Sequence, residues 1–213
     1  MAEFTRARSS EQKEQRMCAI KRAADELFHE HPYHEITLKA ISERLGWSHA
    51  ALYKYVSTKE EIFLEVCADT RRAYNAALLA AYPEGCTYSH EVLAEVWAEQ
   101  LNSHRDYLAY SELLLSIIER NVTVERLAAF KRAYYDEQAE LTARFCANLE
   151  MSEENAGKLF NAVLFHATSI NAWNQSNPLV DEALELAGIS RCVPPLKEEM
   201  RDFIGMCLEH YCR

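Results

Sequence analysis

Residues 37–59 read TLKAISERLGWSHAALYKYVSTK, and this stretch decides how the N-terminal part of the chain folds. Leu38 and Ile41 open a run of apolar residues at the spacing that puts them on one side of a helix. Thr37 precedes the run as a candidate N-cap, and Gly46 follows it where a left-handed backbone can end the helix. The stretch therefore begins with a short helix that has one buried side and two marked ends.

A second short helix follows at once. Ser48 supplies its N-cap two residues after the glycine, and the helical pattern ends before Ser57. So tight a turn keeps the second helix from running back beside the first, and the two helices must cross steeply, as in a helix-turn-helix motif. The second helix of that motif enters the major groove of DNA. The sequence therefore predicts a DNA-reading module at about residues 37–56.

The same region resembles the N-terminal domain of TetR-type (TetR/AcrR-like) transcriptional regulators over residues 13–66. The features that carry the resemblance, in chain order, are Thr37, Ala40, Ile41, Gly46, Ser48, Leu52, Tyr53, Tyr55 and the SxKEEIF run from Ser57. Two departures are visible: His31-Pro32 stands at the corner where glycine is usual, and Trp47 replaces a small aliphatic residue. Neither departure removes a DNA-contacting position.

Composition favours an all-α chain with an ample core, since 49% of the 213 residues are hydrophobic and only five glycines and five prolines interrupt them. The resemblance implies a three-helix helix-turn-helix domain and a linking helix that leads to a C-terminal helical domain for ligand binding and dimerisation. We expect a flexible basic arm at 1–12, the DNA-binding domain at 13–66 and the regulatory domain at 67–213. The periodicity predicts helices near 59–81, 89–103, 106–120, 123–149, 152–176 and 195–212.

The net charge of −10 is divided unevenly along the chain. Residues 1–59 hold 10 Lys and Arg against 8 Asp and Glu, whereas residues 60–213 hold 13 against 25. The acidity thus belongs to the C-terminal part, and a basic N-terminal arm can lie along DNA phosphates. For Arg6 and Arg8, a solvated tail is the equal alternative.

The resemblance implies two kinds of DNA contact. The side chains expected to contact DNA phosphates are those of Thr37, Tyr53 and Lys59. Base readout is expected at Lys39, Ser48, His49, Ala50 and Ala51, because lysine and histidine can bond guanine acceptors and alanine can touch thymine methyl groups. Tyr55 fits a phosphate contact and a packing role equally well.

Dimerisation follows from the size of the module. A palindromic operator needs two reading heads about one helical turn, or ~34 Å, apart, so a single module must pair with a second copy. Two late helical stripes are the candidate interface, with ordinary core as the alternative for each residue: Leu159, Val163, His166, Ile170, Phe203, Met206, Cys207 and His210.

Aromatic side chains in the middle and late helices suggest a pocket for a small-molecule effector. The candidates are Trp97, Tyr107, Tyr110, Tyr134, Phe145, Phe165 and Trp173, for which a core position is the alternative. An effector would act through its different affinities for two states that space the reading heads differently.

Other chemistries find little support in the sequence. The seven cysteines include no Cys-x-x-Cys pair, although Cys192 beside Arg191 is compatible with a redox switch. His29, His31 and His34 can bind a metal or simply complement a helix C-terminus. We expect no cofactor and no metal. With neither a long apolar segment nor a secretion signal, we also expect a cytoplasmic protein that does not enter a membrane.

The sequence thus predicts a homodimeric repressor that a small molecule releases from a palindromic operator, and not an enzyme. Two alternatives remain: a ligand-independent DNA-binding regulator that acts through a protein partner, and a hydrolase with a cysteine nucleophile. The second lacks any local catalytic motif.

Overall fold

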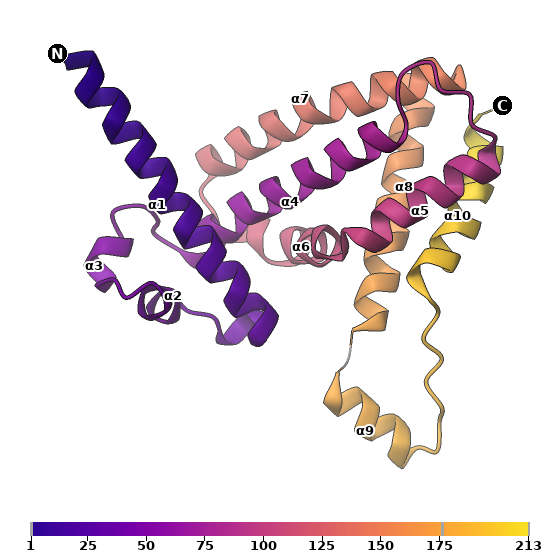
Figure 1. Cartoon of the computed structure of the whole chain (residues 1–213). Helices are drawn as coiled ribbons and strands as arrows, with labels where there is room; N and C mark the ends of the chain where they lie inside the picture. Colours follow the sequence, from indigo (N-terminus) through magenta and orange to yellow (C-terminus); the bar gives the residue numbers. More distant parts are fainter. Residues whose placement is uncertain (1, 176, 213) are drawn as a thin grey trace. The chain divides into compact units, whose positions relative to one another are not determined.

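The computed structural model describes the backbone of residues 2–175 and 177–212, and side chains from Glu11 onward. Within these residues the regular structure is entirely helical, which confirms the all-α prediction. The helices are α1 (Ala2–Glu30), η1 (Tyr33–Glu35), α2 (Leu38–Arg44), α3 (His49–Leu52), α4 (Lys59–Ala81), α5 (His90–Ser103), α6 (Arg105–Ser116), η2 (Ile118–Arg120), α7 (Val124–Leu149), α8 (Glu153–Asn174), α9 (Pro178–Leu186) and α10 (Leu196–Tyr211) (Figure 1). None of them is both long and apolar enough to cross a membrane.

The chain divides into two compact units. Unit 1 is Met1–Asp69 together with Ser116–Phe130, and unit 2 is Thr70–Leu115 together with Lys131–Arg213. The division falls inside α4 and inside α7, so each of these helices contributes to both units. Residues 116–130 belong to unit 1, although the sequence pattern groups them with the regulatory domain.

Unit 1 contains the predicted helix-turn-helix. Thr37 caps α2, because its Oγ1 accepts a hydrogen bond of 3.1 Å from Ala40 N. Ser48 caps α3 in the same way, with 3.3 Å between its Oγ and Ala51 N. Between the two helices Gly46 has φ +65°, a conformation that glycine adopts without steric cost. The predicted caps and turn are confirmed.

The first helix is longer than the sequence pattern indicates. α1 begins at Ala2, so residues 2–12 are helical where composition favours a flexible arm. The side chains of Arg6 and Arg8 lie outside the described part of the chain. Farther along α1, Ile20 and Leu27 are buried and belong to the core of unit 1. The helix contacts α2, as Figure 1 shows.

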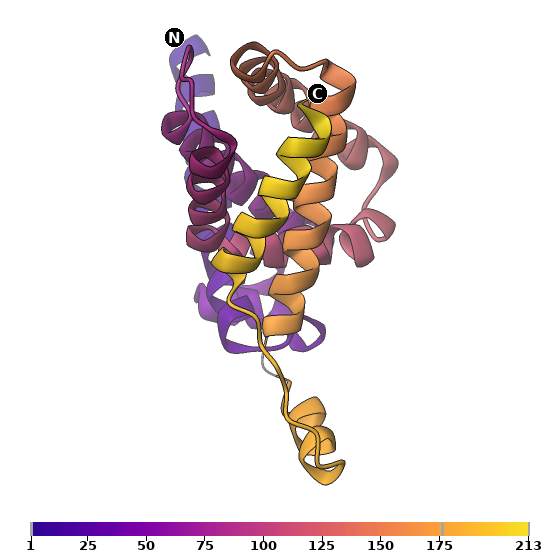
Figure 2. The same ribbon diagram turned by 90° about the vertical axis from the view of Figure 1, so that its right-hand side faces the viewer.

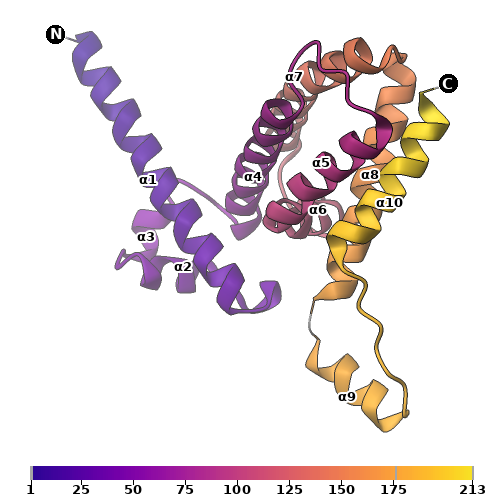
Figure 3. The same cartoon turned by 45° about the vertical axis from the view of Figure 1, so that its right-hand side comes forward.

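Unit 2 is a helical bundle around an aromatic core. α10 packs against both α5 and α8 (Figures 2 and 3). Trp97 is 1% exposed, and its ring lies 5.0 Å from that of Phe145 and 5.5 Å from that of Phe160. Its indole Nε1 donates a hydrogen bond of 2.6 Å to the hydroxyl of Tyr74. The core therefore contains a buried polar contact that fixes the orientation of the tryptophan.

Helix α9 is an α-helix that the sequence pattern misses. Asn177 Oδ1 accepts hydrogen bonds from Leu179 N at 3.2 Å and Val180 N at 3.4 Å, and Pro178 occupies the first turn. Proline at that position favours a helix, because the backbone N–H that it lacks would have no hydrogen-bond acceptor within the helix in any case. The cap signal was present in the sequence, but it stood in a stretch whose prolines and glycine indicate a loop.

We expect Tyr74→Phe to lower the free energy of unfolding by about 1–3 kcal/mol, because the buried Trp97 N–H loses its acceptor. Urea unfolding followed by circular dichroism measures the change. Tyr135→Phe is the matched control, since Tyr135 is 69% exposed and should leave the midpoint unchanged. Equal midpoints for the two variants would contradict a stabilising role for the contact.

Candidate nucleic-acid interface

Helices α2 and α3 each have a buried side and an exposed side. Leu38, Ile41 and Leu52 are buried in unit 1. The opposite sides expose most of the predicted DNA contacts: Thr37, Lys39, Ser48, His49, Ala50 and Tyr53. The structure thus brings six of the nine predicted residues onto one accessible surface, which we call the reading surface.

Helix α3 presents its side chains in a defined arrangement. The rings of His49 and Tyr53 meet edge to face, with centroids 4.8 Å apart at 88°. Tyr53 is nevertheless 51% exposed, so its hydroxyl can reach a phosphate. Ala50 is exposed between them, whereas Ala51 is half-buried and its amide serves the N-cap. The small exposed side chain of Ala50 leaves room for this helix to approach another surface closely.

Lys39 extends from α2 into solvent beside an acidic residue. Its Nζ lies 3.7 Å from Glu43 Oε1, and the two side chains are 76% and 66% exposed. An exposed pair of this kind is worth at most about 1 kcal/mol. DNA can therefore compete with Glu43 for the lysine at small cost.

Lys59 is the first residue of α4, and its ammonium makes contacts within the chain. Its Nζ donates hydrogen bonds to the backbone oxygens of Tyr33 at 2.7 Å and Ile36 at 2.8 Å, and it lies 4.0 Å from the centre of the Tyr33 ring. Burial lowers the pKa of this ammonium. Two of its three donors are thus engaged within the chain, and at most one is left for a phosphate.

The corner at His31-Pro32 is held by these same groups. Residues 33–35 form the short helix η1, and the hydroxyl of Tyr33 donates a 2.9 Å hydrogen bond to Glu60 Oε1. The Tyr33 ring also packs edge-on against Phe63, with centroids 5.1 Å apart. The contacts of Tyr33 and Lys59 thus hold the backbone of the corner in place, where the family usually has a glycine.

Trp47, the second departure, packs in the turn between α2 and α3. The guanidinium of Arg16 lies 4.7 Å from the centre of its ring, and the Tyr55 ring is 6.2 Å away. Tyr55 is half-buried beside this tryptophan, which agrees with its packing role, while its phosphate contact stays a prediction. The large aromatic thus bridges α1 and the turn.

The structure adds one basic residue, Lys54, that the sequence did not lead us to select, and it shows the surroundings of Arg16. Lys54 is exposed directly after α3, and Arg16 is exposed on α1 above Trp47. Lys54 stands between Tyr53 and Tyr55, and a basic residue at the end of a reading helix was the available signal. Arg44, by contrast, is occupied by Glu30 and Glu26 on α1.

The candidate dimer residues separate into three groups by their exposure. Leu159 and Val163 are buried in the core of their own chain, so they offer no surface to a second subunit. Met206 and His210 are exposed. The remaining four, His166, Ile170, Phe203 and Cys207, are half-buried, and the rings of His166 and Phe203 stack at 4.0 Å between α8 and α10.

The candidate pocket residues also separate. Trp97, Tyr107, Tyr110 and Phe145 are buried in the core. Phe165 and Trp173 are 54% and 56% exposed on α8, so within a single chain they face solvent and not an apolar cavity. Tyr134 is half-buried under the guanidinium of Arg71, 4.4 Å away.

The described side chains form no group of three or more metal-ligating residues. His29 and His31 each lie 3.8–4.0 Å from neighbouring carboxylates, and His34 does so with Glu35. Cys192 is an exposed free thiol.

We expect Lys59→Met to lower the free energy of unfolding by about 1.5 kcal/mol, because two backbone oxygens lose a charged donor. Lys54→Met serves as the control, since Lys54 is exposed and should leave stability unchanged. Urea titration of both variants tests this assignment. Equal stability would show that Lys59 does not hold the corner.

Comparison with known proteins agrees with this arrangement. Residues 20–66 match the family model described as bacterial regulatory proteins of the tetR family, and residues 63–209 match the tetracyclin repressor-like C-terminal domain. The fold is similar to that of a Mesorhizobium loti crystal structure described as a TetR-family transcriptional regulator, with TM-score 0.59, 16% identity and coverage of 93% of this chain and 95% of that one. Among curated proteins, none is significantly similar. The two family models together span the chain from residue 20 to residue 209, and the chain belongs to the TetR family of DNA-binding transcriptional regulators.

Proposed function

We propose that this regulator is a homodimeric repressor, which binds a palindromic operator through the reading surface and leaves it when a small molecule binds unit 2. The observation that carries the proposal is the exposed side of α2 and α3, where capped helices hold His49, Tyr53 and Lys39 accessible over a buried core. Tyr53 would contact a phosphate, while His49 and Lys39 would contact base edges.

The need for a second subunit follows from the size of the reading surface. One α3 helix of four residues can contact only a few base pairs, and helix-turn-helix proteins gain specificity by placing two such helices one DNA turn apart. Exposed apolar side chains on α8 and α10, among them Phe165 and Met206, support a face for pairing. We call this surface the α8–α10 face.

The place of the effector is supported by polar side chains inside unit 2. Arg71 is 2% exposed, its Nη2 lies 2.5 Å from Glu137 Oε2, and burial lowers the pKa of its guanidinium. One turn later on α4, Asn75 is 7% exposed and its Nδ2 has no hydrogen-bond partner among the described atoms. Buried polar groups are costly for a fold, and an unsatisfied one is a natural point of contact for a polar ligand.

DNA recognition is tested first by selecting bound fragments from random DNA. We expect His49→Ala to relax the preference at one base pair per half-site, with a loss of about 1–3 kcal/mol in the discrimination against the other bases at that position. Lys54→Gln should weaken binding to all DNA sequences alike. It should also reduce the slope of the logarithm of the binding constant against the logarithm of the salt concentration by about 1 per subunit. Arg105→Gln, an exposed change in unit 2, is the control. Wild-type affinity in both the His49→Ala and the Lys54→Gln variant would refute the assignment.

The effector is tested by screening small molecules for release of the selected operator. We expect Asn75→Leu to keep operator affinity and to raise the concentration needed for release by about tenfold or more, because a hydrogen bond to the ligand is lost. The substitution keeps the branching and the number of heavy atoms of the side chain and removes a buried unsatisfied group, so stability should not fall. If no compound releases the operator, a regulator that acts through a protein partner takes precedence.

A further inference from the structure

Helix α9 and the segment that returns from it form a projection from unit 2. We define the arm as residues 177–194. In all three views α9 lies beyond the ends of α8 and α10, away from the rest of the bundle (Figures 1, 2 and 3). None of the nine residues of α9 is buried. Helices shorter than about 12 residues are marginal in water without tertiary contacts, so this one is expected to have a covering surface.

The base of the arm is firmly attached to the end of α8. Trp173 Nε1 donates a 3.1 Å hydrogen bond to Cys192 O, and Asn174 Nδ2 donates one of 2.8 Å to Pro194 O. Arg191 binds Asp181 Oδ1 at 2.8 Å and also donates to the backbone oxygens of Trp173 and Gln175. The arm is therefore held in a set direction.

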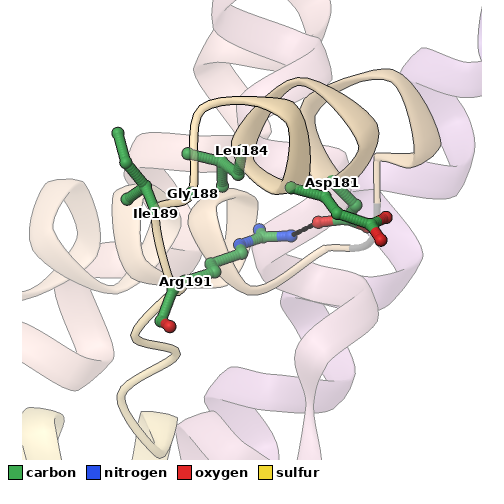
Figure 4. A pocket seen from close by; sticks show the side chains of 7 residues that line it. Asp181, Leu184, Gly188, Ile189 and Arg191 are labelled. Atoms are coloured by element: carbon green, nitrogen blue, oxygen red, sulfur yellow. Dashed lines mark hydrogen bonds and ion pairs between the residues drawn. The ribbon is translucent and has the colours of Figure 1, made fainter.

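The arm exposes apolar side chains along its length. Leu179 is 76% exposed, Leu186 83% and Ile189 58%. A shallow hollow of about 480 Å³ lies between Leu184, Ile189 and the Asp181–Arg191 pair, as Figure 4 shows. Such a surface offers both protruding side chains and a depression that can receive one. Apolar surface of this kind marks an interaction site.

The charge of the arm limits what can cover it. α9 carries Asp181, Glu182 and Glu185, and Arg191, the one Lys or Arg in the arm sequence 177–194, is bound to Asp181. This surplus of negative charge repels DNA and anionic lipid, so a protein surface is the fitting occupant.

The position of the arm identifies that protein as a second copy of the chain. Trp173, which binds the base of the arm, is itself 56% exposed and lies two turns from exposed Phe165 on the α8–α10 face. The apolar surface of the arm thus continues the face proposed for pairing. In a two-fold dimer every contact occurs twice, so if one arm lies against the second subunit, the second arm lies against the first in the same way.

We propose that the arm of each subunit lies against the second subunit of the dimer, so that pairing uses both the α8–α10 face and the two arms. This inference rests on the homodimer of the proposed function. It adds that the arms, and not the central helices alone, determine the affinity of the dimer.

The test compares Leu179→Ser/Leu186→Ser with Val124→Ser in the full chain. Val124 is 75% exposed and lies in unit 1. Its substitution therefore also replaces an exposed apolar side chain by serine, but at a site outside the arm. Sedimentation velocity over a concentration series should show that the double variant raises the dimer dissociation constant roughly 100-fold or more, because apolar burial is lost on both arms. The control should match the wild type. Circular dichroism should show equal helix content in all three proteins.

The possible failures are distinguishable. A double variant that dimerises like the wild type would overturn the role of the arm and leave the homodimer standing. A wild-type protein that occupies its selected operator as a monomer would overturn both. A photo-crosslinking residue at position 186 gives a second readout: covalent dimers support the proposal, whereas crosslinks confined to one chain refute it.

Discussion

The ammonium of Lys59 is the contact on which the reading surface depends. By bonding to the backbone oxygens of Tyr33 and Ile36 it joins the start of α4 to the corner that leads into α2. The first turn of α4 is fixed from its other side too, since Glu61 accepts a 2.8 Å hydrogen bond from Ser57 N and lies 3.5 Å from Arg126. Because α2 and α3 follow that corner directly, these polar bonds act together with buried Leu38, Ile41 and Leu52 to set their orientation.

Charge is distributed in agreement with this architecture. Unit 1 contains the basic residues near the reading surface, whereas the acidic surplus of the chain lies mainly after residue 59. Not every cation in unit 1 is available to DNA. Arg44 is bound by Glu30 and Lys21 by Asp69, so their charges are used within the fold. Lys39, Lys54 and Arg16 are among the exposed cations of unit 1, and exposed cations are the ones that can neutralise phosphates.

Unit 2 combines a tightly packed core with surfaces that a single chain does not cover. Tyr74 and Tyr107 stack at 4.5 Å, and Phe145 and Phe160 meet at 4.8 Å, so the aromatic side chains mainly fill the interior. The exposed aromatics Phe165 and Trp173 and the apolar residues of α9 have no such role within one subunit. Their exposure is explained if a second subunit covers them in the proposed dimer.

The sequence by itself determined the helical class, the helix-turn-helix and most helix ends, because periodicity and N-caps act over three or four residues. Thr37 and Ser48 both cap the helices that they were expected to cap. Tertiary structure alone decided which side chains are accessible, since that depends on residues far apart in the chain. Periodicity placed Val163 and His166 on one stripe, but it could not show that Val163 is buried in the core of its own chain while His166 is half-buried. It also could not show that Lys59 faces two carbonyl oxygens more than twenty residues away.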